Sequence, residues 1–134
     1  MPKTTATLVQ AEGNFYKEQF DKATEEEFEA VLEQRIDEAA AEVQREVGSD
    51  TYGSNDTITV ALLTTAETYL AVAKCLQTIE SIIATWDREQ LPSEFVSAEH
   101  VATMIARYRS LAKEILDQFD ATFDEGVKPY LTAQ

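Results

Sequence analysis

The stretch from Ile58 to Trp86 constrains the fold more than any other part of the chain. It reads ITVALLTTAETYLAVAKCLQTIESIIATW and contains neither proline nor glycine. Its apolar residues recur at steps of three and four, which is helical spacing and not the alternation of a strand. Because the first half is apolar nearly all round, we expect it to be buried on more than one side. The stretch predicts a central helix about 45 Å long.

Charged residues within this helix argue against a membrane span. Glu67, Lys74 and Glu80 interrupt the apolar run, and a bilayer requires about 20 predominantly apolar residues. The first ten residues, MPKTTATLVQ, lack the apolar core of a secretory signal. We therefore expect neither a membrane anchor nor secretion.

Two further helices are expected to flank the central one. Thr24, followed by three glutamates, matches a capping box, with the Glu27 side chain reaching back to the Thr24 amide. Gly48 and Gly126 are placed to end the first and last helices. The connections are short, which favours antiparallel neighbours. The predicted fold is all-α: a bundle of three long, roughly antiparallel helices over about 24–47, 57–88 and 98–124 plus a short N-terminal element, with Leu62, Leu70, Leu76, Ile79 and Ile83 in the core.

The domain organisation follows from these boundaries. Residues 1–23 form an N-terminal arm or short helix, residues 24–126 the helical domain, and residues 127–134 a C-terminal tail. Pro129 favours an extended conformation there. The apolar groups of the tail suit docking to a partner, and we predict that partner contacts involve Val127, Lys128, Pro129, Tyr130 and Leu131.

The net charge of −14 is concentrated on the first long helix, where residues 24–47 carry nine acidic side chains and two arginines. This balance argues against an adhesive nucleic-acid surface, which needs a clustered basic face. Three interpretations stay open: a solvated surface, adaptation to high salt, and a surface that repels or imitates DNA. The residues assigned to this acidic channel or solvent face are Glu29, Glu33, Asp37 and Glu42.

No residue pattern indicates catalysis, a cofactor or a metal site. Cys75 lies within the apolar face of the central helix and is interpreted as a small core residue. His100 has no Glu-x-x-His partner motif and is expected at the surface of the last helix. We therefore predict that the protein is not an enzyme.

Four aromatic residues have two uses that the sequence leaves open. Phe15, Tyr16 and Phe20 lie in the N-terminal arm, and Tyr52 lies in the loop before the central helix. They either dock on the domain itself or contact a neighbouring subunit.

The order and residue composition of these segments carry a family resemblance. An acidic helix ending AAAEVQREVG, a long helix containing AETYLAVAKCL and a last helix containing ARYRSLAKEIL follow a short aromatic arm. This arrangement, over roughly residues 5–125, resembles the head–tail adaptor (connector) proteins of tailed bacteriophages and related viruses.

The resemblance implies a structural virion protein. Such adaptors bind beneath the portal protein as a homo-oligomeric ring, commonly dodecameric, and extend the DNA channel without binding DNA specifically. They present a platform for the next neck or tail protein (a stopper-like protein). The implied location is the virion neck, with assembly in the host cytoplasm, and no cofactor or enzyme activity is implied.

Two alternatives remain beside this one. An inhibitor that imitates DNA would carry carboxylates spaced like phosphates along one face, whereas the last helix carries Arg107, Arg109 and Lys113 on its outer side. A general helical protein-binding module is the other alternative. Oligomeric state discriminates between them, because the inhibitor would act as a monomer.

Overall fold

The computed structural model describes residues 2–85 and 98–127, with side chains as far as residue 119. Within these ranges the chain forms α-helices and one short 3-10 helix and contains no strand, so the predicted all-α class is confirmed. The elements in chain order are α1 (Ala6–Gly13), η1 (Lys17–Phe20), α2 (Glu25–Val47), α3 (Ser49–Tyr52), α4 (Thr57–Thr85) and α5 (Ala98–Val127).

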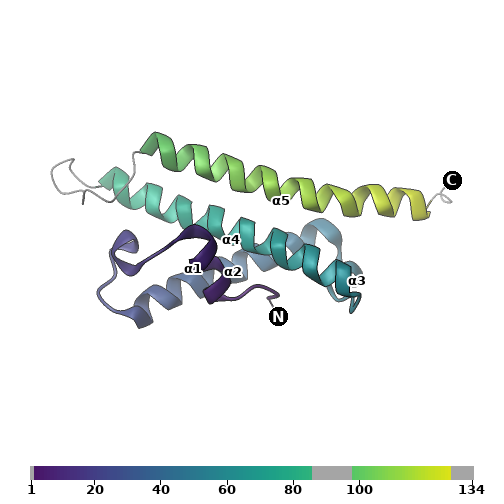
Figure 1. Cartoon of the computed structure of the whole chain (residues 1–134), viewed down its shortest axis with the longest axis horizontal. Helices are drawn as coiled ribbons and strands as arrows, with labels where there is room; N and C mark the ends of the chain where they lie inside the picture. The colour runs from purple at the N-terminus through teal and green to yellow at the C-terminus, as the bar shows by residue number, and fades with distance from the viewer. Residues whose placement is uncertain (1, 86–97, 128–134) are drawn as a thin grey trace.

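The predicted central helix is α4, and every other element contacts it. Figure 1 shows α5 lying along one side of α4 and α2 along another, with α1 crossing a third. The colour gradient shows that α4 runs antiparallel to both α2 and α5. The bundle-like arrangement of three long helices therefore agrees with the prediction.

Side chains cap the beginnings of the long helices as the sequence indicates. The Glu27 backbone N–H donates to the Thr24 hydroxyl over 3.1 Å at the start of α2. The Glu27 carboxylate accepts from the same hydroxyl, rather than from the Thr24 amide as predicted. At the start of α4, the Thr59 backbone N–H donates to the Asp56 carboxylate over 3.0 Å. Each cap satisfies an amide that the first helical turn leaves without a partner.

Two predicted boundaries require correction, and a third cannot be compared with the structure. The connection at 48–56 contains the short helix α3, where the Tyr52 amide bonds to the Gly48 carbonyl. Gly126 does not end the last helix, because α5 continues to Val127. Val127 thus belongs to α5, and its predicted contact with a partner stays a prediction. The described part of α4 ends at Thr85, and the predicted end near residue 88 lies outside the described residues.

The N-terminal element consists of α1 and η1, and both pack against α2 and α4. The Phe20 ring centroid lies 5.5 Å from those of both Phe15 and Phe28. A Cβ atom on Gly13 would lie 2.3 Å from the Phe15 ring. Only glycine therefore allows this ring to pack over the end of α1.

The core follows the predicted stripe of α4, with two exceptions. Leu70, Ile79 and Ile83 are buried as predicted. Leu62 and Leu76 are only partly buried, because no element covers α4 completely. Its N-terminal end is the least covered, and Ile58 there is 71% exposed.

We predict that Leu70→Ala destabilises the fold by about 2–3 kcal/mol, the lower part of the range for buried leucines. Leu70 is 3% exposed but borders a groove, so part of the space that it leaves can relax. Chemical denaturation measures the loss, and Leu8→Ala, at a residue 47% exposed, is the control. A loss below about half a kcal/mol for Leu70→Ala would show that the burial is not as described.

Candidate interaction surfaces

A fully buried carboxylate attaches the N-terminal segment to α4. Glu67 is 0% exposed, and its Oε2 accepts from the backbone N–H groups of Lys3 (2.6 Å) and Thr4 (2.8 Å). Its Oε1 accepts from the Tyr52 hydroxyl at 2.5 Å. We call this group of Lys3, Thr4, Tyr52 and Glu67 the Glu67 clamp. It joins the N-terminus, α3 and α4 at one point, and its donors compensate the buried charge.

Two further contacts extend the clamp. The Lys3 ammonium lies 4.6 Å from the centre of the Tyr52 ring, a favourable cation–π arrangement. The hydroxyls of Thr4 and Thr68 lie 2.6 Å apart and share a hydrogen bond. Burial, reinforced by the hydrogen bond to Glu67, raises the pKa of Tyr52, so this phenol stays protonated and acts as a donor.

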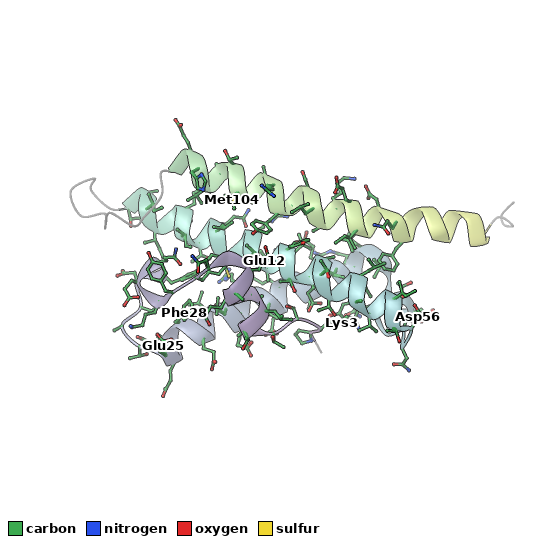
Figure 2. All side chains as sticks on the ribbon, in the orientation of Figure 1. Lys3, Glu12, Glu25, Phe28, Asp56 and Met104 are labelled. Atoms are coloured by element: carbon green, nitrogen blue, oxygen red, sulfur yellow. The ribbon has the colours of Figure 1, made fainter. Side chains whose placement is uncertain are left out.

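The other end of α1 is attached to α5. The Tyr108 hydroxyl donates to the Glu12 carboxylate over 2.9 Å. Burial and this hydrogen bond raise the pKa of Tyr108 to about 12. Figure 2 shows Lys3 and Glu12 near opposite ends of α1. The N-terminal element is therefore fixed at both ends and belongs to the folded domain.

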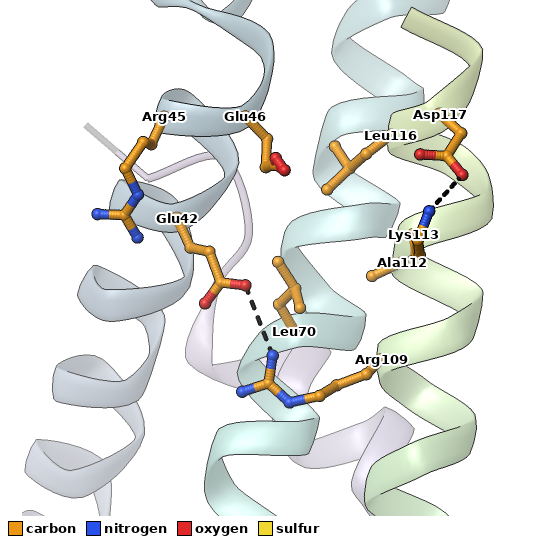
Figure 3. Close-up of a pocket in the computed structure, with 9 residues that line it drawn as sticks. All are labelled: Glu42, Arg45, Glu46, Leu70, Arg109, Ala112, Lys113, Leu116 and Asp117. Carbon is orange, nitrogen blue, oxygen red and sulfur yellow. Dashed lines mark hydrogen bonds and ion pairs between the residues drawn. The ribbon is translucent and has the colours of Figure 1, made fainter. Parts of the chain in front are cut away.

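A groove of about 580 Å³ lies between α2 and α5, with α4 beneath it. Figure 3 shows the apolar side chains Leu70, Ala112 and Leu116 among charged residues from the two outer helices. The charged residues that line it are Glu42, Arg45, Glu46, Arg109, Lys113 and Asp117. The groove thus combines an apolar floor with a charged rim of both signs.

Glu42 is the central ionic residue of this groove. Its carboxylate lies 3.0 Å from the Lys74 ammonium and 3.5 Å from the Arg109 guanidinium. Burial opposes ionisation, but the hydrogen bond and charge of Lys74, with the charges of Arg109 and Arg45, keep the pKa of Glu42 below its usual value. Glu42 therefore connects α2 to α4 and α5. The prediction that Glu42 belongs to the outer acidic face is corrected.

The remaining residues of that face are open to solvent. Glu29, Glu33 and Asp37 are exposed along α2. Their four-residue spacing corresponds to about 6 Å along the helix, whereas one strand of DNA carries a charge about every 3.4 Å. This spacing applies to these three residues, and α2 carries six further acidic side chains.

Two large apolar side chains, one on α1 and one at the start of α4, remain exposed. Ile58 is 71% exposed and Leu8 is 47% exposed, and these are the large apolar side chains most open to solvent in the described part of the chain. The neighbouring Ala61 and Thr65 on α4 are also exposed. We call Leu8, Ile58, Ala61 and Thr65 the α1–α4 face.

The aromatic residues left open by the sequence pack inside the chain itself. Phe15, Phe20 and Tyr52 are 4%, 1% and 7% exposed, and Tyr16 is partly buried. The structure therefore places them as intramolecular contacts of the folded chain. Of the predicted tail, Lys128, Pro129, Tyr130 and Leu131 lie outside the described residues.

Cys75 is a core residue. It is 0% exposed, and burial raises the pKa of its thiol to about 12. Since the thiolate is the reactive form, this environment suppresses its reactivity at neutral pH. His100 is exposed in the first turn of α5.

Among the residues that the structure describes, no cluster of three or more histidine, cysteine, aspartate or glutamate side chains could hold a metal ion. By length and composition one described helix, α4, could cross a membrane, but half of its apolar window is buried in the fold. A core helix of a helical bundle has the same properties.

Comparison with protein-family models, with curated proteins and with solved structures found no match for this chain.

The sequence did not reveal the Glu67 clamp or the groove. In the sequence, Glu67 is visible only as a charge that interrupts an apolar run. Its position within that run is the signal that could have identified it. A charged residue flanked by apolar neighbours in a core helix requires a buried partner. The partners are up to 64 residues away in sequence, so only the fold identifies them.

We predict that Glu67→Gln destabilises the fold by about 1–3 kcal/mol, because an amide N–H₂ cannot accept hydrogen bonds from the donors that face it. Amide hydrogen exchange at Lys3 and Thr4 should accelerate as the N-terminal segment detaches. Glu33→Gln, at an exposed position of α2, should change neither quantity. Unchanged exchange in Glu67→Gln would contradict the role assigned to the clamp.

Proposed function

We propose that this protein is a structural head–tail adaptor of a virion neck. In this role it assembles in the host cytoplasm as a homo-oligomeric ring, of about twelve copies as the family resemblance implies, beneath the portal protein. The ring extends the DNA channel and offers a platform for the next neck or tail protein. The proposal involves no enzymatic step and no cofactor.

The observation that carries the proposal is the uncovered α1–α4 face. Ile58 and Leu8 remain exposed, although α4, which carries Ile58, is the central helix of the bundle. Exposed large apolar side chains on neighbouring helices are candidate contacts with other proteins. In a ring of identical subunits, such a face would pack against the neighbouring copy. An assembly function explains why the rest of the chain leaves part of the apolar surface of α4 uncovered.

The acidic face of α2 is compatible with a channel. Glu29, Glu33 and Asp37 are exposed and repel phosphates, whereas basic residues would bind DNA with a strong dependence on salt. The exposed Arg107 and Lys113 on α5 interrupt the negative charge that an imitation of DNA would need. We therefore favour a channel or outer wall over an inhibitor of DNA-binding enzymes.

The C-terminal tail is proposed to contact the portal. Tyr130 and Leu131 supply apolar anchors, and full burial of a leucine is worth about 1.5–3 kcal/mol. Repetition of a weak contact around a ring raises its strength through effective concentration.

We predict that Ile58→Asp prevents assembly on the portal. Native mass spectrometry would count the copies bound to portal rings encoded in the same genome. The wild-type chain should form a complete ring, whereas Ile58→Asp should leave incomplete complexes, because a charge at this contact would be desolvated. Ala30→Asp places the same charge at an exposed position of α2 and should assemble normally. Normal assembly of Ile58→Asp would exclude this face from the contact.

We also predict that deleting residues 128–134 abolishes attachment to portal-bearing heads while leaving helicity and thermal stability nearly unchanged. The reason is that the described core is supplied by buried residues between Val9 and Leu116, all of which the deletion retains. Circular dichroism and co-sedimentation with purified heads measure the two properties. A truncated chain that still co-sediments would show that the tail is not the portal anchor.

A further inference from the structure

The helices α2 and α5 lie on different sides of α4 and contact each other little. Each of them contacts α4 far more than it contacts the other. The groove of about 580 Å³ separates them where the C-terminal part of α2 faces α5. Apolar packing therefore does not fix the distance between these two helices at the groove, and the charged side chains that span it are left to do so.

One carboxylate connects the three long helices at this point. Figure 3 shows the Glu42 side chain on α2 and the Arg109 side chain on α5 reaching toward each other across α4. Glu42 Oε2 lies 3.5 Å from Arg109 Nη1, and Glu42 Oε1 lies 3.0 Å from Lys74 Nζ on α4. The two oxygens of Glu42 thus hold one cation from each of the other two helices. We call Glu42, Lys74 and Arg109 the Glu42 latch.

The charge of Glu42 decides whether this arrangement attracts or repels. Lys74 and Arg109 share Glu42 as their counter-ion, so a neutral side chain at position 42 leaves two positive charges close together. The other charged groups of the groove do not replace it, since Asp117 already lies 2.8 Å from Lys113. The charged groups that then face one another are Arg45 and Glu46 on α2, Lys74 on α4, and Arg109, Lys113 and Asp117 on α5.

The fold keeps Glu42 charged at neutral pH. Burial alone would raise its pKa, but the hydrogen bond and charge of Lys74, with the charges of Arg109 and Arg45, hold that pKa below its usual value. The stabilisation from the latch is therefore complete above the pKa that Glu42 has in the unfolded chain. It is lost as the pH falls through the lower pKa of the folded chain.

The latch lies over apolar side chains that the closed groove keeps from solvent. Leu70, Ala112 and Leu116 form the floor and are 3%, 0% and 8% exposed. A movement of α2 away from α5 would uncover them. An open groove would therefore present an apolar surface that the closed groove hides.

We propose that the Glu42 latch holds α2 close to α5, and that loss of the charge on Glu42 opens the groove and uncovers its apolar floor. The groove is then a two-state element, closed at neutral pH and opened by acid. The latch acts within one chain, so it is independent of the adaptor role.

Distances between spin labels test the movement. The labels are attached to Ala41→Cys on α2 and Ser110→Cys on α5, two exposed and uncharged positions next to Glu42 and Arg109. The wild-type chain controls for labelling of Cys75, which is buried. At neutral pH, Glu42→Gln should lengthen the mean distance by about 1–2 Å or more, the scale of helix shifts in switching proteins. Glu33→Gln, on the exposed face of α2, should leave the distance unchanged.

The pH dependence separates the latch from general effects of acid. Without the substitution at position 42, the α2–α5 distance should lengthen as the pH falls, whereas in Glu42→Gln it should already be long at neutral pH and change little. Labels at Thr65→Cys on α4 and Ser110→Cys on α5 should keep their distance in both chains, because these two helices pack directly on each other. The same acid-induced lengthening of the α2–α5 distance with and without Glu42→Gln would overturn the proposal, since another group would then cause it.

Arg109→Gln provides a second variant that tests the latch from the other helix. The Arg109 side chain is 39% exposed, so its loss leaves the core intact. Arg109→Gln should lengthen the α2–α5 distance as Glu42→Gln does, and both should increase the fluorescence of the apolar dye ANS as the floor is uncovered. Circular dichroism verifies that the helices are retained. Wild-type distances and dye binding in both folded variants would show that the freed side chains simply turn into solvent, and that Glu42 does not act as a latch.

Discussion

Burial of α4 is the constraint on which the rest of the structure depends. A helix that is apolar nearly all round must be covered on several sides, and the chain uses every other element for this purpose. Its coverage is uneven. Leu63 and Val72 are fully buried, whereas Ile58 is 71% exposed. Where coverage ends, at the α1–α4 face and at the groove between α2 and α5, the structure offers its candidate interaction surfaces.

The Glu67 clamp explains how so short an N-terminal element can cover α4. Buried contacts such as that of Val9 supply little orientation by themselves, because apolar attraction is non-directional. Backbone donors at Lys3 and Thr4 on a carboxylate have a defined geometry and are stronger than neutral hydrogen bonds. The hydrogen bond between Tyr108 and Glu12 fixes the opposite end. The clamp therefore sets the position of the element, and the apolar contacts supply much of its stability.

The two candidate interaction surfaces of the bundle differ in character. The α1–α4 face is apolar and suits a contact with a neighbouring subunit. The groove between α2 and α5 combines an apolar floor with three basic and three acidic side chains. Opposite charges steer encounter and set orientation more than they add affinity.

The sequence by itself determined the helix class, the three long helices and the residues that begin them, because spacing and capping act within a few residues. It also placed Leu70 and Ile79 in the core, since a helical stripe identifies its buried side. It did not determine the partners of Glu67, the inward position of Glu42 or the extent to which Leu62 is covered. Each of these depends on residues far apart in the chain, such as Lys3 near Glu67 and Arg109 near Glu42. Tertiary structure alone decided them, because the relative placement of helices follows from packing across the whole domain and not from any local pattern.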